Sequence, residues 1–123
     1  METTITIDGR AVPFRATAAV PRLYRIKFRR DIMQDISAIQ ASIDKAEREG
    51  GVPVASLEMF ENVAFIMARH AAPDTVPGTV EEWLDEFDTF SIYQIFPQIA
   101  ELWQRNMETT AIAKKNSVPP FGK

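Results

Sequence analysis

The chain has 123 residues and no cysteine, and its formal net charge of -3 accompanies a sequence pI near 5.2. With 46% hydrophobic and 25% charged residues, the composition is that of an ordinary folded domain with one core, which excludes a disordered chain or a fibre. The lack of thiols excludes a disulfide framework and a thiolate zinc site, and the acidic balance disfavours a general attraction to nucleic acid or anionic lipid.

The N-terminal residues and the length of the apolar stretches indicate where the protein is located. The N-terminus METTITIDGR has neither the basic start nor the apolar run of a secretory signal. No apolar stretch approaches the roughly 20 residues that span a bilayer. We therefore expect a cytoplasmic protein without a membrane partner.

A β-hairpin is predicted over residues 4 to 15. Apolar and polar residues alternate on both sides of Asp8-Gly9 in the sequence TITIDGRAVPFR. Asp-Gly between two alternating runs is a strong hairpin signal, because glycine supplies the positive φ of a tight primed turn. A two-stranded hairpin is marginal alone, so we expect its apolar face to rest on a helix.

The segment that follows, residues 22 to 29, fits two secondary structures. Tyr24, Ile26 and Phe28 alternate with basic residues, which is a strand period, but the same segment also suits a helix. Pro21, with its φ already set for a first helical turn, favours the helix.

Two longer helices are predicted next. From Asp31, the spacing of four, three and four residues in one apolar stripe indicates an amphipathic helix that ends at Gly50-Gly51, with Asp35 on the solvent side. The helix LEMFENVAFIMARHAA is apolar nearly all round and is stopped by Pro73, which is typical of a helix at the centre of a core. The stripe of the first helix consists of Ile32, Ile36, Ile39, Ile43 and Ala46.

The second half of the chain predicts a short helix and a last long one. Thr79-Val80-Glu81-Glu82 has the capping-box pattern and begins a helix to about Phe87. The last helix runs from about residue 89 or 91 to Asn106, with a kink or break at Pro97. The fold class is therefore mainly α: one domain over residues 1–107, with four to five helices and an N-terminal β-hairpin, followed by a flexible tail over residues 108–123.

The residues offer little for catalysis. His70 is the only histidine, and its place in a last helical turn favours a structural role at the negative end of the helix dipole. Glu81 and Glu82 are one of two carboxylate pairs that could in principle serve acid-base or magnesium chemistry, but a solvated helix face explains them better. No phosphate loop, nucleophile elbow or metal spacing occurs. We predict no enzyme activity, no catalytic residue, no metal and no cofactor.

Two surfaces are candidates for partner binding. The carboxylate-rich segment from Glu81 to Trp103 holds a row of aromatic residues, part of which we expect to stay exposed in a domain that already has other apolar residues to bury. The basic residues from Arg22 to Arg30 could contact phosphates beside Tyr24, so a DNA-binding regulator is the alternative function. The candidate residues for partner binding are Phe87, Phe90, Tyr93, Phe96, Trp103, Arg22 and Arg25.

The order of these segments resembles a known family. ITIDG, TAAVPRLYRIKFRRDI, LEMFENVAFIMARHA and PGTVEEWLDEFDTFSIYQIFPQIAELW, followed by a lysine-containing tail, are similar to the tail assembly chaperones of long-tailed bacteriophages and prophages of Gram-positive hosts. The resemblance covers roughly Thr4 to Trp103.

The resemblance implies a small, mostly helical protein that acts through protein contacts, without enzyme activity or a cofactor. Its partners would be the tape-measure protein, which it keeps soluble, and the major tail (tube) protein, whose subunits it helps recruit; self-association stays open. Members are also made in a longer form by ribosomal frameshifting, and Lys114-Lys115-Asn116 could be encoded by an A-rich slippery site.

Overall fold

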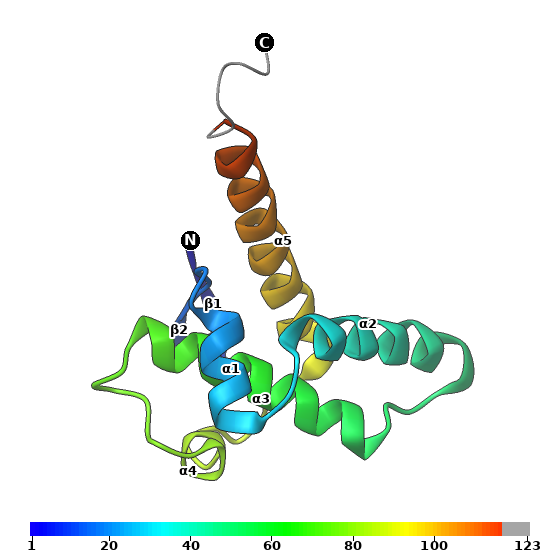
Figure 1. Ribbon diagram of the computed structural model, residues 1–123. Coiled ribbons are helices and arrows are strands. Elements are labelled where there is room, and N and C mark those ends of the chain that lie inside the picture. Colours follow the sequence, from blue (N-terminus) through cyan, green and yellow to red (C-terminus); the bar gives the residue numbers. More distant parts are fainter. Residues whose placement is uncertain (117–123) are drawn as a thin grey trace.

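The computed structural model describes the backbone of residues 1–116 and the side chains of residues 1–108. Within this part, five helices follow an N-terminal two-stranded antiparallel sheet, so the mainly helical fold predicted from the sequence is confirmed (Figure 1). In chain order the elements are β1 (Glu2–Ile7), β2 (Arg10–Arg15), α1 (Val20–Phe28), α2 (Ile32–Glu49), α3 (Val54–Ala71), α4 (Val80–Leu84) and α5 (Ile92–Asn116).

The hairpin turns at Asp8 and Gly9, as the sequence predicts. Both residues have positive φ, 54° and 78°, which is the geometry of a type I′ turn. The register pairs Ile5 with Val12, and the inward-pointing side chains of both strands are buried. This apolar face lies against α3 and α5, which supply the cover that a two-stranded sheet needs.

The segment that fitted either a strand or a helix is α1. Pro21 lies in its first turn, where the missing N–H of proline costs no helical hydrogen bond. The helix ends at Arg29, whose φ of 60° places it in the left-handed conformation that commonly stops a helix. Val20 and Tyr24 form the buried face of α1.

Helix α3 is the centre of the core, as its nearly uniform apolar character predicts. Residues 63–68 are all buried, and α3 contacts β2 and the other four helices. Beside it, the ring of Trp83 from α4 meets the rings of Phe14 in β2 and Phe65 in α3 edge to face, with centroids 6.3 and 6.0 Å apart. Trp83 therefore joins the hairpin, α3 and α4 in one aromatic cluster.

Asp35 is not on the solvent side of α2, where the sequence pattern placed it. Its side chain is 2% exposed and lies between two groups of α1 and the α1–α2 connection. The Tyr24 hydroxyl donates to Asp35 Oδ2 at 2.6 Å, and Arg30 donates to both carboxylate oxygens at 2.8 Å. Asp35 thus holds α1 against α2 through three hydrogen bonds from two partners, which compensate its burial.

The protonation states of this cluster follow from the same contacts. Burial alone would raise the pKa of Asp35, but the hydrogen bonds from Arg30 and Tyr24 outweigh it and lower the pKa below its ordinary value. Burial, and then the bond to Asp35, raises the pKa of the Tyr24 phenol. The stability that Asp35 contributes is therefore complete above its ordinary pKa and is lost as the pH falls through its lower folded value.

The second half of the chain differs from prediction in its boundaries. Thr79 caps α4 as predicted, with its hydroxyl oxygen accepting from the Glu82 amide at 3.2 Å, but α4 ends at Leu84. Helix α5 contains Pro97 without a break, because the proline lies in the second turn on the exposed face and deprives only one carbonyl of its partner. The helix continues past the expected end at Asn106.

The tail predicted from residue 108 overlaps the last part of α5. The backbone is helical up to Asn116, and residues 117–123 of that prediction lie outside the described residues. In Figure 1 the later turns of α5 extend away from the rest of the domain. Among residues 1–116, no helix has both the length and the apolar character needed to cross a membrane.

Removal of the Tyr24 hydroxyl tests the contact that holds α1. Tyr24→Phe keeps the ring and removes one hydrogen bond to a buried carboxylate, so we expect the free energy of unfolding at pH 7 to fall by about 1.5 to 3 kcal/mol. The measurement is urea denaturation followed by circular dichroism. Tyr93→Phe, at a side chain that is 53% exposed, is the matched control and should change it by less than about 0.5 kcal/mol. Equal effects of the two changes would contradict the role given to Tyr24.

Candidate functional site

Most of the aromatic row predicted as a partner surface lies in the core. Phe96 is fully buried, and Phe87 and Trp103 are 8% and 6% exposed. Phe90 is half-buried and packs against Trp83 and Phe60, with ring centroids 5.2 Å apart in both pairs. The expectation that part of the row is exposed is therefore corrected for these rings: Phe87 packs against Trp83 and Phe96 against Phe60 of α3, and Trp103 is buried as well.

Tyr93 is the member of the row that stays at the surface. In the first turns of α5, Ile92, Ile95 and Phe96 are buried, whereas Tyr93, at the border of this buried face, is 53% exposed. A single exposed ring of this kind is common on protein surfaces and does not make a binding site.

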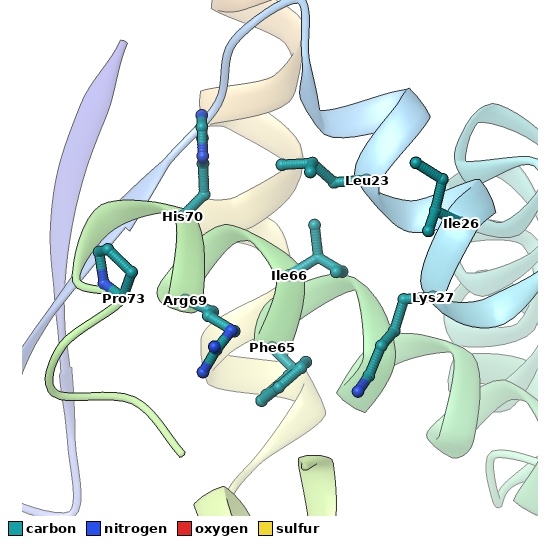
Figure 2. A pocket seen from close by; sticks show the side chains of 8 residues that line it. All are labelled: Leu23, Ile26, Lys27, Phe65, Ile66, Arg69, His70 and Pro73. Atoms are coloured by element: carbon teal, nitrogen blue, oxygen red, sulfur yellow. The ribbon is translucent and has the colours of Figure 1, made fainter. Parts of the chain in front are cut away.

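A hollow on the surface lies between α1 and α3. We call this hollow, of about 500 Å³, the α1–α3 groove (Figure 2). The buried side chains of Phe65 and Ile66 form its floor, and Leu23 and Ile26 of α1 form one wall. Leu23 and Ile26 are 37% and 65% exposed, so the groove presents apolar surface to the solvent. The remaining lining residues are Lys27, Arg69, His70 and Pro73.

This groove was not predicted from the sequence. Ile26 lies in the segment that fitted either a strand or a helix, with the helix favoured, and the two apolar faces of that helix were not distinguished. On a helix, Leu23 and Ile26 share one face, which is distinct from the buried face of Val20 and Tyr24. The spacing of Leu23 and Ile26 could have revealed this second apolar face in the sequence. The groove itself exists only because α3 lies beneath that face.

Two cations border the groove and bind neutral backbone groups. Lys27 Nζ donates to the carbonyl oxygen of Gly78 at 2.9 Å. Arg69 Nη1 donates to the carbonyl oxygens of Val76 and Pro77 at 2.8 and 2.9 Å. These bonds hold the connection between α3 and α4 along the groove and leave the positive charges without a carboxylate partner in these contacts.

His70 closes the other side of the groove. Its Nε2 lies 2.8 Å from the hydroxyl oxygen of Thr17, and that oxygen also accepts the Ala19 amide at 3.2 Å. Burial lowers the pKa of His70, and the positive charges of Arg15 and the N-terminal ammonium lower it further, while Glu2 acts weakly in the opposite direction. His70 is therefore a neutral hydrogen-bonding partner of Thr17 at pH 7, and the role predicted for it at the negative end of the helix dipole stays a prediction.

The basic residues of the alternative prediction divide into two groups. Arg30 is used in the contact with Asp35. Arg22 and Arg25 are exposed and lie with Arg29 along one face of α1, beside the groove wall. Arg22 thus lies next to the groove wall, whereas Arg25 lines a separate hollow with Arg29 and Arg30. Both are exposed, unlike Phe87, Phe96 and Trp103 in the core.

The paired carboxylates Glu81 and Glu82 lie at the surface of α4. Glu81 and Glu82 are exposed in the first turn of α4, and the Glu82 carboxylate accepts the Thr79 hydroxyl at 2.9 Å. Among the residues that the structure describes, no three histidine, aspartate or glutamate side chains gather in a way that could hold a metal ion.

Comparison with known proteins identifies no family for this chain. No protein-family model matches the chain, and neither the curated proteins nor the solved structures contain a significant match to it.

The environment of His70 predicts its titration. Because the chain has one histidine, its ring resonance in an NMR titration is unambiguous, and we expect a midpoint below the ordinary value of 6.5. Arg15→Gln should raise the midpoint, whereas Arg48→Gln, at an exposed residue of the last turn of α2, should not. A midpoint at or above 6.5 would contradict the buried, positively charged surroundings described here.

The same shift has a consequence for stability. When the pH falls below 6.5, the unfolded chain takes up a proton before folded His70 does, so the free energy of unfolding decreases until the pH reaches the folded pKa. His70→Gln should remove this part of the pH dependence.

Proposed function

We propose that this protein acts by binding another polypeptide, as a tail assembly chaperone of the phage type, and that the α1–α3 groove is its client site. The observation that carries the proposal is the exposed apolar wall of Leu23 and Ile26 above a floor of Phe65 and Ile66. An isolated apolar side chain at a surface is ordinary, but a contiguous apolar hollow with a polar border is typical of an interaction site.

The position of α1 makes this surface available without unfolding the domain. Tyr24 is fully buried and bonded to Asp35, and the ring of Phe28 lies 5.1 Å from that of Tyr24 and 6.5 Å from that of Phe65. One face of α1 is thus fixed in the core while Leu23 and Ile26 stay outward. A groove with fixed walls loses little conformational freedom when a partner binds.

The resemblance of the sequence to tail assembly chaperones supports the identity of the client. The proposed partners are the tape-measure protein, a long, apolar and helical chain, and the major tail protein. A client that exposes apolar helix faces before assembly suits an apolar groove, because burial of both surfaces removes them from water. The proposed action is shelter of the client through contacts, in the cytoplasm of a bacterial host and without a cofactor.

Polar substitution of the groove wall tests this function. Leu23→Ser and Ile26→Ser together should reduce the tape-measure fragment captured in a pull-down by at least about tenfold, because two apolar anchors of the groove are lost. Both side chains are partly exposed, so we expect only a small change in stability, which thermal unfolding checks.

The matched control is an exposed apolar residue outside the groove. Val54, the first residue of α3, is 71% exposed, and Val54→Ser should leave capture unchanged. If the wild-type chain captures no tape-measure fragment, the chaperone function is wrong. If it captures fragments and the groove variant does so equally well, the client site lies elsewhere.

DNA binding is the second candidate, favoured by the exposed row of Arg22, Arg25 and Arg29. Among the described residues, none of these three guanidinium groups takes part in an ion pair. If the row binds phosphates, duplex DNA should shift in a gel at low salt, and Gln at all three positions should abolish the shift. A shift that survives this triple change would exclude the row as the DNA site. The matched control replaces Lys45, Arg48 and Arg105.

A further inference from the structure

The α1–α3 groove combines an apolar interior with a border of one charge sign. The floor is Phe65 and Ile66, and the wall is Leu23 and Ile26. The polar side chains that line it are cations or neutral: Lys27, Arg69 and His70 (Figure 2). Among the residues that the structure describes, no carboxylate lines this groove.

Among the residues that the structure describes, no carboxylate forms an ion pair with Lys27 or Arg69. Arg69 and Lys27 donate to backbone carbonyl oxygens, which satisfies their hydrogen bonds but leaves the charge in place. Carboxylates do occur on the far side of Lys27, in a separate hollow of about 310 Å³ that Glu58, Glu61 and Glu81 help to line. Lys27 therefore stands at the boundary between a positive groove and a negative hollow.

Three further cations lie beside the groove, and one of them, Arg15, pairs with Glu2 at 3.9 Å. Arg22 is one helical turn from Ile26 and exposed, so it flanks the wall. Near His70, the N-terminal ammonium and Arg15 are close enough to disfavour protonation of the imidazole. A partner that brings carboxylates to either side would gain complementary charge, whereas one with lysines would meet repulsion.

The helices that form the groove also limit the secondary structure that a bound partner can have. Both walls are helices, whose own N–H and C=O groups are bonded internally and can pair with no added strand. The partner must then satisfy its own backbone, which a helix does. Helix α1 has nine residues, or about 13 Å at 1.5 Å per residue, which matches two to three turns of a docked helix.

We propose that the α1–α3 groove selects an amphipathic helix whose apolar stripe is flanked by carboxylates. The apolar stripe rests on Ile66 beside the wall of Leu23 and Ile26, and the flanking carboxylates face Arg22 on one side and Lys27 and Arg69 on the other. This inference rests on the proposed function, in which the groove is the client site, and it names the class of helix that the site prefers.

Three synthetic peptides of about 18 residues, long enough to form several helical turns, test the preference. Two share one apolar stripe at positions i, i+3, i+4 and i+7 and carry either glutamates or lysines beside it; the third is a scrambled glutamate peptide without a stripe. Binding of the labelled peptides to the full chain is measured by fluorescence anisotropy. The glutamate peptide should bind on the order of tenfold more tightly than the lysine peptide at about 50 mM salt, and less so at about 300 mM.

Charge variants connect the preference to the named residues. Arg22→Gln with Lys27→Gln should reduce the difference between the two striped peptides to about two- or threefold. The matched control, Lys45→Gln with Arg48→Gln in the last turns of α2, makes the same charge change at exposed residues outside the groove and should leave the difference intact.

Several outcomes would overturn the inference. Equal binding of the lysine peptide, equal binding of the scrambled peptide, or no binding of any peptide would each reject an acidic amphipathic occupant. Displacement of the glutamate peptide by duplex DNA would assign the surface to phosphates. A wild-type dimer in sedimentation that Ile26→Ser makes monomeric would assign the groove to a second copy of the chain. None of these results alters the pull-down of tape-measure fragments, whose failure separately rejects the proposed function.

Discussion

The contact of Tyr24 and Arg30 with the buried Asp35 carboxylate determines where α1 lies, and the candidate site depends on α1. A carboxylate that is 2% exposed is costly unless its oxygens are bonded. The three hydrogen bonds that compensate it come from Tyr24 and Arg30, before and after the C-terminal end of α1. The short helix is thereby fixed against α2 with one apolar face turned inward and another left beside α3.

The aromatic cluster around Trp83 explains why the second half of the chain is so rich in rings. A domain of this size has a large surface for its volume, so it needs large side chains to fill its core. Trp83 packs against rings from the hairpin, from α3 and from the segment after α4. Phe87 and Phe96 therefore stabilise the fold, and the exposed apolar surface considered as a candidate site lies between α1 and α3.

Helix α1 has three faces with different roles. Tyr24 and Val20 anchor it, Leu23 and Ile26 form the groove wall, and the arginines lie on the remaining face. The groove and the row of Arg22 and Arg25 are adjacent, so an apolar and a charged surface meet along the same edge. This arrangement is the basis for the proposal that the partner of the groove is itself amphipathic.

The amino-acid pattern by itself determined the elements of this protein, and the tertiary structure decided which of their faces remain exposed. The Asp8-Gly9 turn, the Thr79 cap and the all-round apolar α3 depend on neighbours in sequence, so local chemistry was enough to predict them. The burial of Asp35 and the exposure of Ile26 depend on residues far along the chain. Periodicity describes the faces of one helix at a time, and a groove exists only where the faces of two helices meet.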